Sequence, residues 1–157
     1  MSEFRIVAMP SDAATRFRDS GLDANGQPPE RHISDGDGMP CRHCLTDVAM
    51  GESFLILAYR PFPKPQPYAE IGPIFLHADT RRRYEDSSIP AMFLARERIL
   101  IRGYGADDRI VYGTGKAIPT TDLAAAAADL FRRTDVAYAH LRSASNNCFQ
   151  CRLERSE

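Results

Sequence analysis

The sequence has little that would mark a membrane-spanning, secreted or nucleic-acid-binding protein. It has no run of about 18 apolar residues, so no transmembrane helix is expected. The first residues, MSEFRIVAMP, are too polar and too short for the core of a signal peptide, which favours a cytoplasmic protein. Its 20 basic and 21 acidic residues leave a net charge of −1, whereas general nucleic-acid or membrane-surface binders carry a marked basic excess.

Two common catalytic motifs are also missing. The glycines of GYG and GTG, at 103–105 and 113–115, do not lie between a strand and a helix, as a dinucleotide-binding loop requires. Ser143 and Ser145 lack the strand–turn–helix context of a nucleophile elbow. The absence of tryptophan excludes nothing specific. The sequence therefore names no reaction through these motifs.

The pattern of apolar residues predicts a mainly antiparallel sheet of five to seven strands. The stretch 53–60, SFLILAYR, is nearly continuously apolar and is expected to be buried on both faces at the centre of the sheet. Alternating residues at 97–104 and 109–112 predict an antiparallel hairpin. The other expected strands lie at 3–9, 71–78, 136–141 and 148–153.

One long helix is expected in the C-terminal half, beginning after Thr121 as its N-cap and ending near Arg133. Its apolar face would consist of Leu123, Ala127, Leu130 and Phe131. Short helices are expected at 11–17, after Asp79 and at 89–95, whereas 18–40 has no periodicity and is expected to be a loop. The fold class is therefore α+β. At 157 residues the chain is expected to form one domain, 1–157.

The most specific chemical signal is a pair of Cys-x-x-Cys motifs, Cys41/Cys44 and Cys148/Cys151. Two residues between thiols allow one turn to present both sulfurs to one point, and two such turns would supply the four thiolates that zinc prefers. A four-thiolate zinc site has no open position, so it would be structural. The sequence predicts this site if the fold brings the two motifs together.

The cysteines have two other interpretations. They could be unmetallated thiols or a redox-active pair, or they could be small buried apolar residues. A reducing cytoplasm favours metal over lasting disulfides. His43, inside the first motif, could replace one sulfur or donate a hydrogen bond to a ligand.

A second candidate site consists of histidines and arginines on predicted strands. His77 and His140 end apolar stretches, and together with Arg102 or Arg142 they would suit an anion or an acid–base pair. Structural histidines in hydrogen bonds are the competing interpretation. The run at 81–83, three arginines, could bind phosphate at a helix start or could be an ordinary solvated surface.

Several segments resemble a bacterial family classified only as a domain of unknown function. They are PYAEIGPIFLHAD, RGYGADDRIVYGTG and VAYAHLRSASNNCFQCRLER, with PCRHC and GES upstream. The resemblance extends over residues 38–155. It implies a small, single-domain bacterial protein, and it brings no activity, substrate or cofactor.

The sequence thus predicts a zinc-stabilised ligand-binding or interaction module with a structural four-cysteine site. Its ligand would be an unknown small molecule or protein, and a homodimer remains an option. No general nucleic-acid or membrane partner is expected. The alternatives are an enzyme that uses the pocket of histidines and arginines, and a thiol redox protein.

Overall fold

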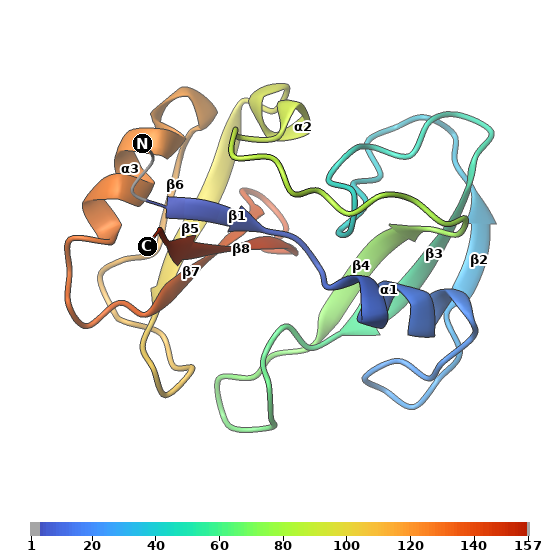
Figure 1. Cartoon of the computed structure of the whole chain (residues 1–157), viewed down its shortest axis with the longest axis horizontal. Helices are drawn as coiled ribbons and strands as arrows, with labels where there is room; N and C mark the ends of the chain where they lie inside the picture. Colours follow the sequence, from blue (N-terminus) through green and yellow to red (C-terminus); the bar gives the residue numbers. More distant parts are fainter. Residues whose placement is uncertain (1–3, 157) are drawn as a thin grey trace.

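The computed structural model describes residues 4–156, and it contains two antiparallel sheets that lie side by side (Figure 1). The five-stranded sheet has the order β1-β8-β7-β5-β6, and the three-stranded sheet has the order β2-β3-β4. The strands of the larger sheet are β1 (Phe4–Val7), β5 (Arg98–Tyr104), β6 (Lys116–Pro119), β7 (Tyr138–Ser143) and β8 (Phe149–Arg155). Those of the smaller sheet are β2 (Glu30–Ile33), β3 (Ser53–Tyr59) and β4 (Gly72–His77).

Each sheet packs against its own helix. Helix α3 (Leu123–Leu130) covers the larger sheet with one apolar face, so the predicted burial of Leu123, Ala127, Leu130 and Phe131 is confirmed. Helix α1 (Ser11–Arg18) buries Ala14 and Phe17 against the smaller sheet. The short helix α2 (Ala91–Leu94) adds Met92 and Phe93 to the larger core.

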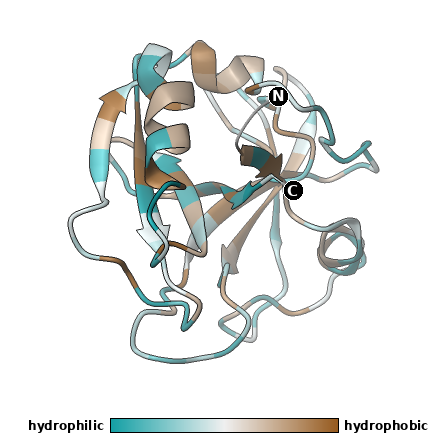
Figure 2. Cartoon of the chain, turned by 60° about the vertical axis from the view of Figure 1, so that its left-hand side comes forward, coloured by the Kyte–Doolittle hydropathy of each residue, from teal (hydrophilic) through white to brown (hydrophobic). Residues whose placement is uncertain are grey.

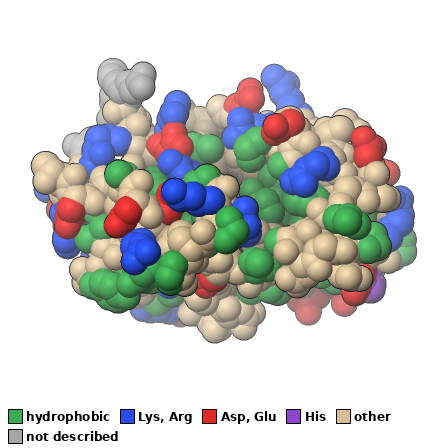
Figure 3. All heavy atoms as spheres, turned by 90° about the horizontal axis from the view of Figure 1, so that it is seen from below, with side chains coloured by type: hydrophobic (Ala, Val, Ile, Leu, Met, Phe, Trp, Pro, Cys, Tyr) green, Lys and Arg blue, Asp and Glu red, His purple; other side chains and the backbone are tan. Residues whose placement is uncertain are grey.

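The two cores meet at the turn formed by residues 40–46. Cys41 and Cys44 belong to the core of the smaller sheet, whereas Leu45 belongs to that of the larger sheet. Most of the buried residues are apolar, and Figure 2 shows hydrophobic residues along the strands and mostly hydrophilic residues in the connecting loops. On the face seen in Figure 3, basic and acidic side chains are interspersed, which is consistent with the near-zero net charge.

The predicted α+β class and mainly antiparallel pairing are confirmed, but the strands form two sheets rather than one. The strand at 53–60 is central, as expected, although in the smaller sheet. The predicted loop at 18–40 is wrong because it contains β2, all of whose residues are exposed. An exposed edge strand paired with β3 through its backbone needs no apolar alternation, so periodicity could not reveal it.

The predicted hairpin partner at 109–112 is wrong. Strand β5 pairs instead with β6 and β7, and Ile110 makes a single bridge to Tyr104. The hydroxyl of Thr114 explains the difference, because it accepts the Gly103 N–H at 2.9 Å and donates to the Val111 carbonyl at 2.6 Å. These bonds make 111–114 a tight turn before β6 begins.

The long helix is also wrong. A 3₁₀ turn, η1 (Thr120–Asp122), leads directly into α3, and η1 makes no side-chain cap. Helical structure ends at Leu130, and Arg133 pairs with Asp135 in the turn that follows. The residues after Asp79 form no helix, and Arg83 instead donates to the Ala8 carbonyl at 2.6 Å.

No helix among residues 4–156 has the length and hydrophobicity needed to cross a membrane.

Candidate metal centre

The turn at 40–46 folds so that two thiols face the same point. Its ends are joined by a bridge between Pro40 and Asp47, and within it the Leu45 N–H donates to the Cys41 carbonyl at 3.0 Å. Leu45 has a φ of 54°, a left-handed conformation that is unfavourable for a residue with a branched side chain. Its side chain is 1% exposed, so burial in the larger core holds the turn in this shape.

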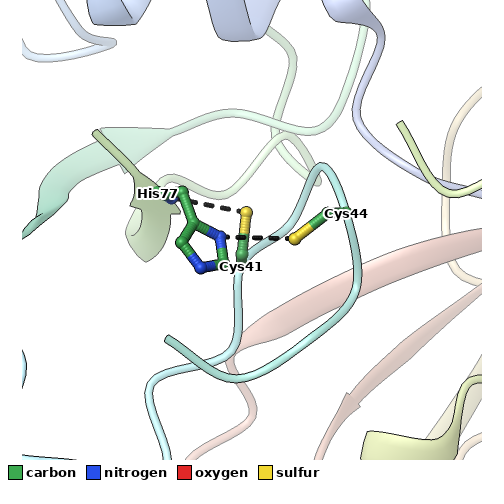
Figure 4. A group of neighbouring side chains, drawn as sticks. All are labelled: Cys41, Cys44 and His77. Atoms are coloured by element: carbon green, nitrogen blue, oxygen red, sulfur yellow. Dashed lines mark hydrogen bonds between the residues drawn. The ribbon is translucent and has the colours of Figure 1, made fainter. Parts of the chain in front are cut away.

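Cys41, Cys44 and His77 form the one cluster of three potential metal ligands found among the described residues. One ligand atom from each lies within 4.8 Å of the others, and all three side chains are buried (Figure 4). His77 is the last residue of β4, so the strand brings its ring against the turn. Its Nδ1 lies 3.3 Å from the Cys44 Sγ, and its backbone N–H donates to the Cys41 Sγ at 3.4 Å.

The hydrogen bonds around the sulfurs favour a thiolate at Cys44. Its Sγ lies 3.0 Å from the Thr46 hydroxyl. The hydrogen bond with Cys41 lowers the pKa of Cys44, and those with His77 and Thr46 lower it further, although burial opposes them. The same hydrogen bond and burial raise the pKa of Cys41. Of the two thiols, Cys44 is therefore the one whose surroundings favour the thiolate.

A carboxylate lies behind the histidine. The Glu52 Oε1 is 3.6 Å from the His77 Nε2, and Glu52 is also paired with Arg81 at 3.4 Å. The Nε2 is buried and has no hydrogen-bond partner among residues 4–156. On the other side, the Arg18 Nε donates to the His77 carbonyl at 2.9 Å. A carboxylate at the second nitrogen of a ligand histidine is typical of metal sites.

The other two cysteines do not join this group. The cluster contains neither Cys148 nor Cys151, so the four sulfurs do not form the zinc site expected from the sequence. Cys151 is fully buried in the larger core, which raises its pKa, and Cys148 is partly exposed just before β8. The side chain of Arg42 reaches from the turn to this strand, and its Nε donates to the Phe149 carbonyl at 2.7 Å. The two motifs are thus linked through this arginine.

The predicted pocket of histidines and arginines is only partly assembled. Arg102 lies opposite His140 in the β5–β7 register, and the Arg142 Nη2 is 3.0 Å from the His140 Nδ1. Glu70 pairs with both arginines, at 2.9 Å and 3.1 Å. His77 belongs to the other sheet and to the cysteine cluster.

His140 has the surroundings of a structural residue. It is fully buried, and its ring centroid lies 4.6 Å from that of Tyr104 and 4.8 Å from that of Phe149. Burial and the nearby arginines lower its pKa well below the usual range. A histidine that stays neutral in an aromatic cluster is not prepared to accept a proton near neutral pH.

Two other sequence candidates also have other partners. His43 shares a hydrogen bond of 2.9 Å with the Ser11 hydroxyl and is not in the ligand cluster. Arg81 pairs with Glu52, and the three arginines do not begin a helix. Sequence reasoning missed Glu52 and the place of His77 beside the cysteines. The position of His77 at a strand end was the available signal, but only the bridge between Cys41 and Phe75 of β4 places that end next to the turn.

Comparison with known families agrees with the sequence resemblance. The family model described as "Protein of unknown function (DUF1203)" matches residues 38–155. The chain belongs to this family. The matched region includes the turn, β4 and β8, and it excludes β1 and α1. Searches of curated proteins and of solved structures found no match.

Proposed function

We propose that this member of the family is a zinc-stabilised ligand-binding or interaction module whose metal is held by Cys41, Cys44 and His77. The convergence of these three donors in one buried cluster is the observation that supports it. Thiolate sulfur and imidazole nitrogen together suit zinc better than calcium or magnesium, which prefer oxygen ligands. Glu52 would orient the imidazole from its far side.

Zinc in this place would fasten the turn at 40–46 to the end of β4. These segments are already joined by the weak hydrogen bond from the His77 N–H to the Cys41 Sγ. Three protein ligands leave one of zinc's four positions for a further ligand, such as water. The same turn presents Arg42 to β8, so the metal would also steady the junction between the two sheets.

Matched cysteine variants test this ligand set against the four-thiolate set expected from the sequence. We expect purified protein under reducing conditions to contain about one equivalent of zinc. Cys44→Ser should lose it, whereas Cys148→Ser should retain it, because only Cys44 is in the cluster. Loss of zinc in both variants would favour a site with four thiolates. Well below one equivalent in the wild-type protein would refute the metal proposal.

A thiol redox function is the second candidate, and it rests on the row Cys44, His77 and Glu52. These groups lie in the order of a nucleophile, a base and a group that orients the base, at 3.3 Å and 3.6 Å, somewhat longer than the hydrogen bonds of such a row. The Cys44 thiolate would attack a substrate disulfide and release one substrate thiolate. Cys41, losing its proton to solvent, would then displace the second, so that the substrate is reduced and a Cys41–Cys44 disulfide forms.

Titration with a small disulfide separates the two candidates. A redox protein should form an intramolecular disulfide with oxidised glutathione, and dithiothreitol should reverse it. Zinc-loaded protein should resist the same oxidation, because both thiolates are bound to the metal. Cys41→Ser should instead stop at the mixed disulfide with glutathione, since no second thiol remains to resolve it.

A further inference from the structure

A cavity of about 430 Å³ is lined in part by Pro40 and Arg42 of the turn. Its walls come from the turn, from β4, from the segment joining α2 to β5, and from the β7–β8 connection at 143–148. The volume is within the range of small-molecule binding sites. None of the three proposed metal ligands lines it.

Arg42 places a buried positive charge in the cavity wall. Its side chain is 2% exposed, and it donates to the Phe149 carbonyl at 2.7 Å and to the Pro40 carbonyl at 2.5 Å. Both acceptors are neutral. No carboxylate within residues 4–156 forms an ion pair with Arg42. A buried guanidinium without a counter-charge is unfavourable unless something else neutralises it.

One donor atom of Arg42 has no partner among the described residues. The Nη2 makes no hydrogen bond to the part of the chain that the structure describes, yet it is not among the fully buried unpartnered atoms. It therefore reaches accessible space, and the cavity is the space that Arg42 lines. Its two N–H bonds are available to an incoming acceptor.

The rest of the lining combines a second cation with polar and apolar groups. Arg98 lines the cavity and is bound only to the Ala117 carbonyl, whereas Arg96 is neutralised by Asp47 at 2.8 Å. Glu97 is the one acidic residue in the lining, which leaves an excess of positive charge. The Gln150 side chain is 5% exposed, and its buried Oε1 has no partner in residues 4–156. Phe75 is partly exposed and supplies apolar surface, and the buried Phe93 and Ile99 lie behind the lining.

We propose that this cavity binds a small organic anion, with a carboxylate or phosphate head at Arg42 and an apolar body against Phe75. The head would supply the counter-charge that the protein itself does not. Arg98 would add a second, more exposed contact. The Gln150 Oε1 would accept a hydrogen bond from a hydroxyl or amide on the ligand. This site does not depend on whether the neighbouring cluster holds zinc.

Benzoate and phenyl phosphate are suitable probes, and benzyl alcohol is the neutral control. We expect calorimetric titration to show that at least one anion binds roughly 10-fold or more tightly than the alcohol, since hydrogen bonds to charged groups are the stronger ones. The preferred anion identifies the head group. Arg42→Met should weaken anion binding roughly 10- to 100-fold. Arg98→Gln should weaken it less, and the exposed Arg132→Gln should leave it unchanged.

Cys148 provides a second measurement that does not depend on Arg42. It is the partly exposed thiol of the four and lines the cavity, so a bound anion should slow its alkylation by iodoacetamide. The part of the alkylation that is missing in Cys148→Ser is the part that belongs to Cys148. If Arg42→Met does not fold, two results decide whether the cavity binds an anion: the affinity of Arg98→Gln, and the slower alkylation of Cys148 in the presence of the anion.

Equal binding of anions and alcohol, or anion binding unaffected by the folded arginine variants, would overturn the proposal. Zinc content measured on the same samples keeps this result separate from the metal proposal.

Discussion

Replacing Arg42 by methionine should destabilise the protein more than any other single arginine change near the junction. Methionine keeps much of the aliphatic length but removes both hydrogen bonds, leaving the Phe149 and Pro40 carbonyls without their donor. Each hydrogen bond to a charged group contributes roughly 1.5–3 kcal/mol. Removal of the buried charge offsets part of this loss. We therefore expect the free energy of unfolding to fall by roughly 2–4 kcal/mol.

Urea unfolding followed by circular dichroism measures this change. For a protein of this size it corresponds to a melting temperature lower by roughly 4–16 °C. The matched control is Arg98→Met, which lines the same cavity but is exposed, and which should change stability by no more than about 0.5 kcal/mol. If the two variants unfold at the same urea concentration, the reasoning from buried hydrogen bonds is wrong.

Three further predictions follow from other parts of the molecule. Zinc at about 1,000 times its dissociation constant should stabilise the protein by about 4 kcal/mol, and a chelator should reverse this in the wild type but not in Cys44→Ser. Because the pKa of His140 is depressed by burial and by neighbouring arginines, its contribution to stability is complete above about pH 6.5 and is lost as the pH falls towards its folded pKa. His140→Phe should flatten urea-unfolding stability against pH between about 6.5 and 5, and an unchanged slope would exclude this residue as the cause. Asp23→Ala should lower the free energy of unfolding by roughly 1–3 kcal/mol, because the Asp23 carboxylate accepts backbone N–H bonds from Asn25, Gln27 and Ala58. Asp19→Ala is the control, because the Asp19 side chain accepts no such bonds among the described residues.

The regular elements with a clear apolar pattern could be predicted from the sequence. The stretch SFLILAYR became β3, and the face Leu123, Ala127 and Leu130 became the buried side of α3. Elements held by hydrogen bonds rather than by burial could not be predicted. Strand β2 is exposed throughout, and backbone hydrogen bonds with β3 hold it in place. The turn before β6 depends on the hydrogen bonds of the Thr114 hydroxyl.

The candidate metal site likewise has one part that the sequence predicted and one part that it did not. The spacing of Cys41 and Cys44 by itself determined that two thiols would share one turn, because two intervening residues leave few other arrangements. Only the tertiary structure decided their partner. The bridge between Cys41 and Phe75 brings the end of β4, and with it His77, to the turn, while the Arg42 side chain lies between the turn and the strand of the second cysteine pair.

The distance between two side chains three residues apart depends on only a few backbone torsions, so the sequence determines it directly. The meeting of residues 41 and 77, or of 42 and 149, depends on how two sheets pack. That packing is a balance of many weak contacts spread over the whole chain, and no short motif contains it.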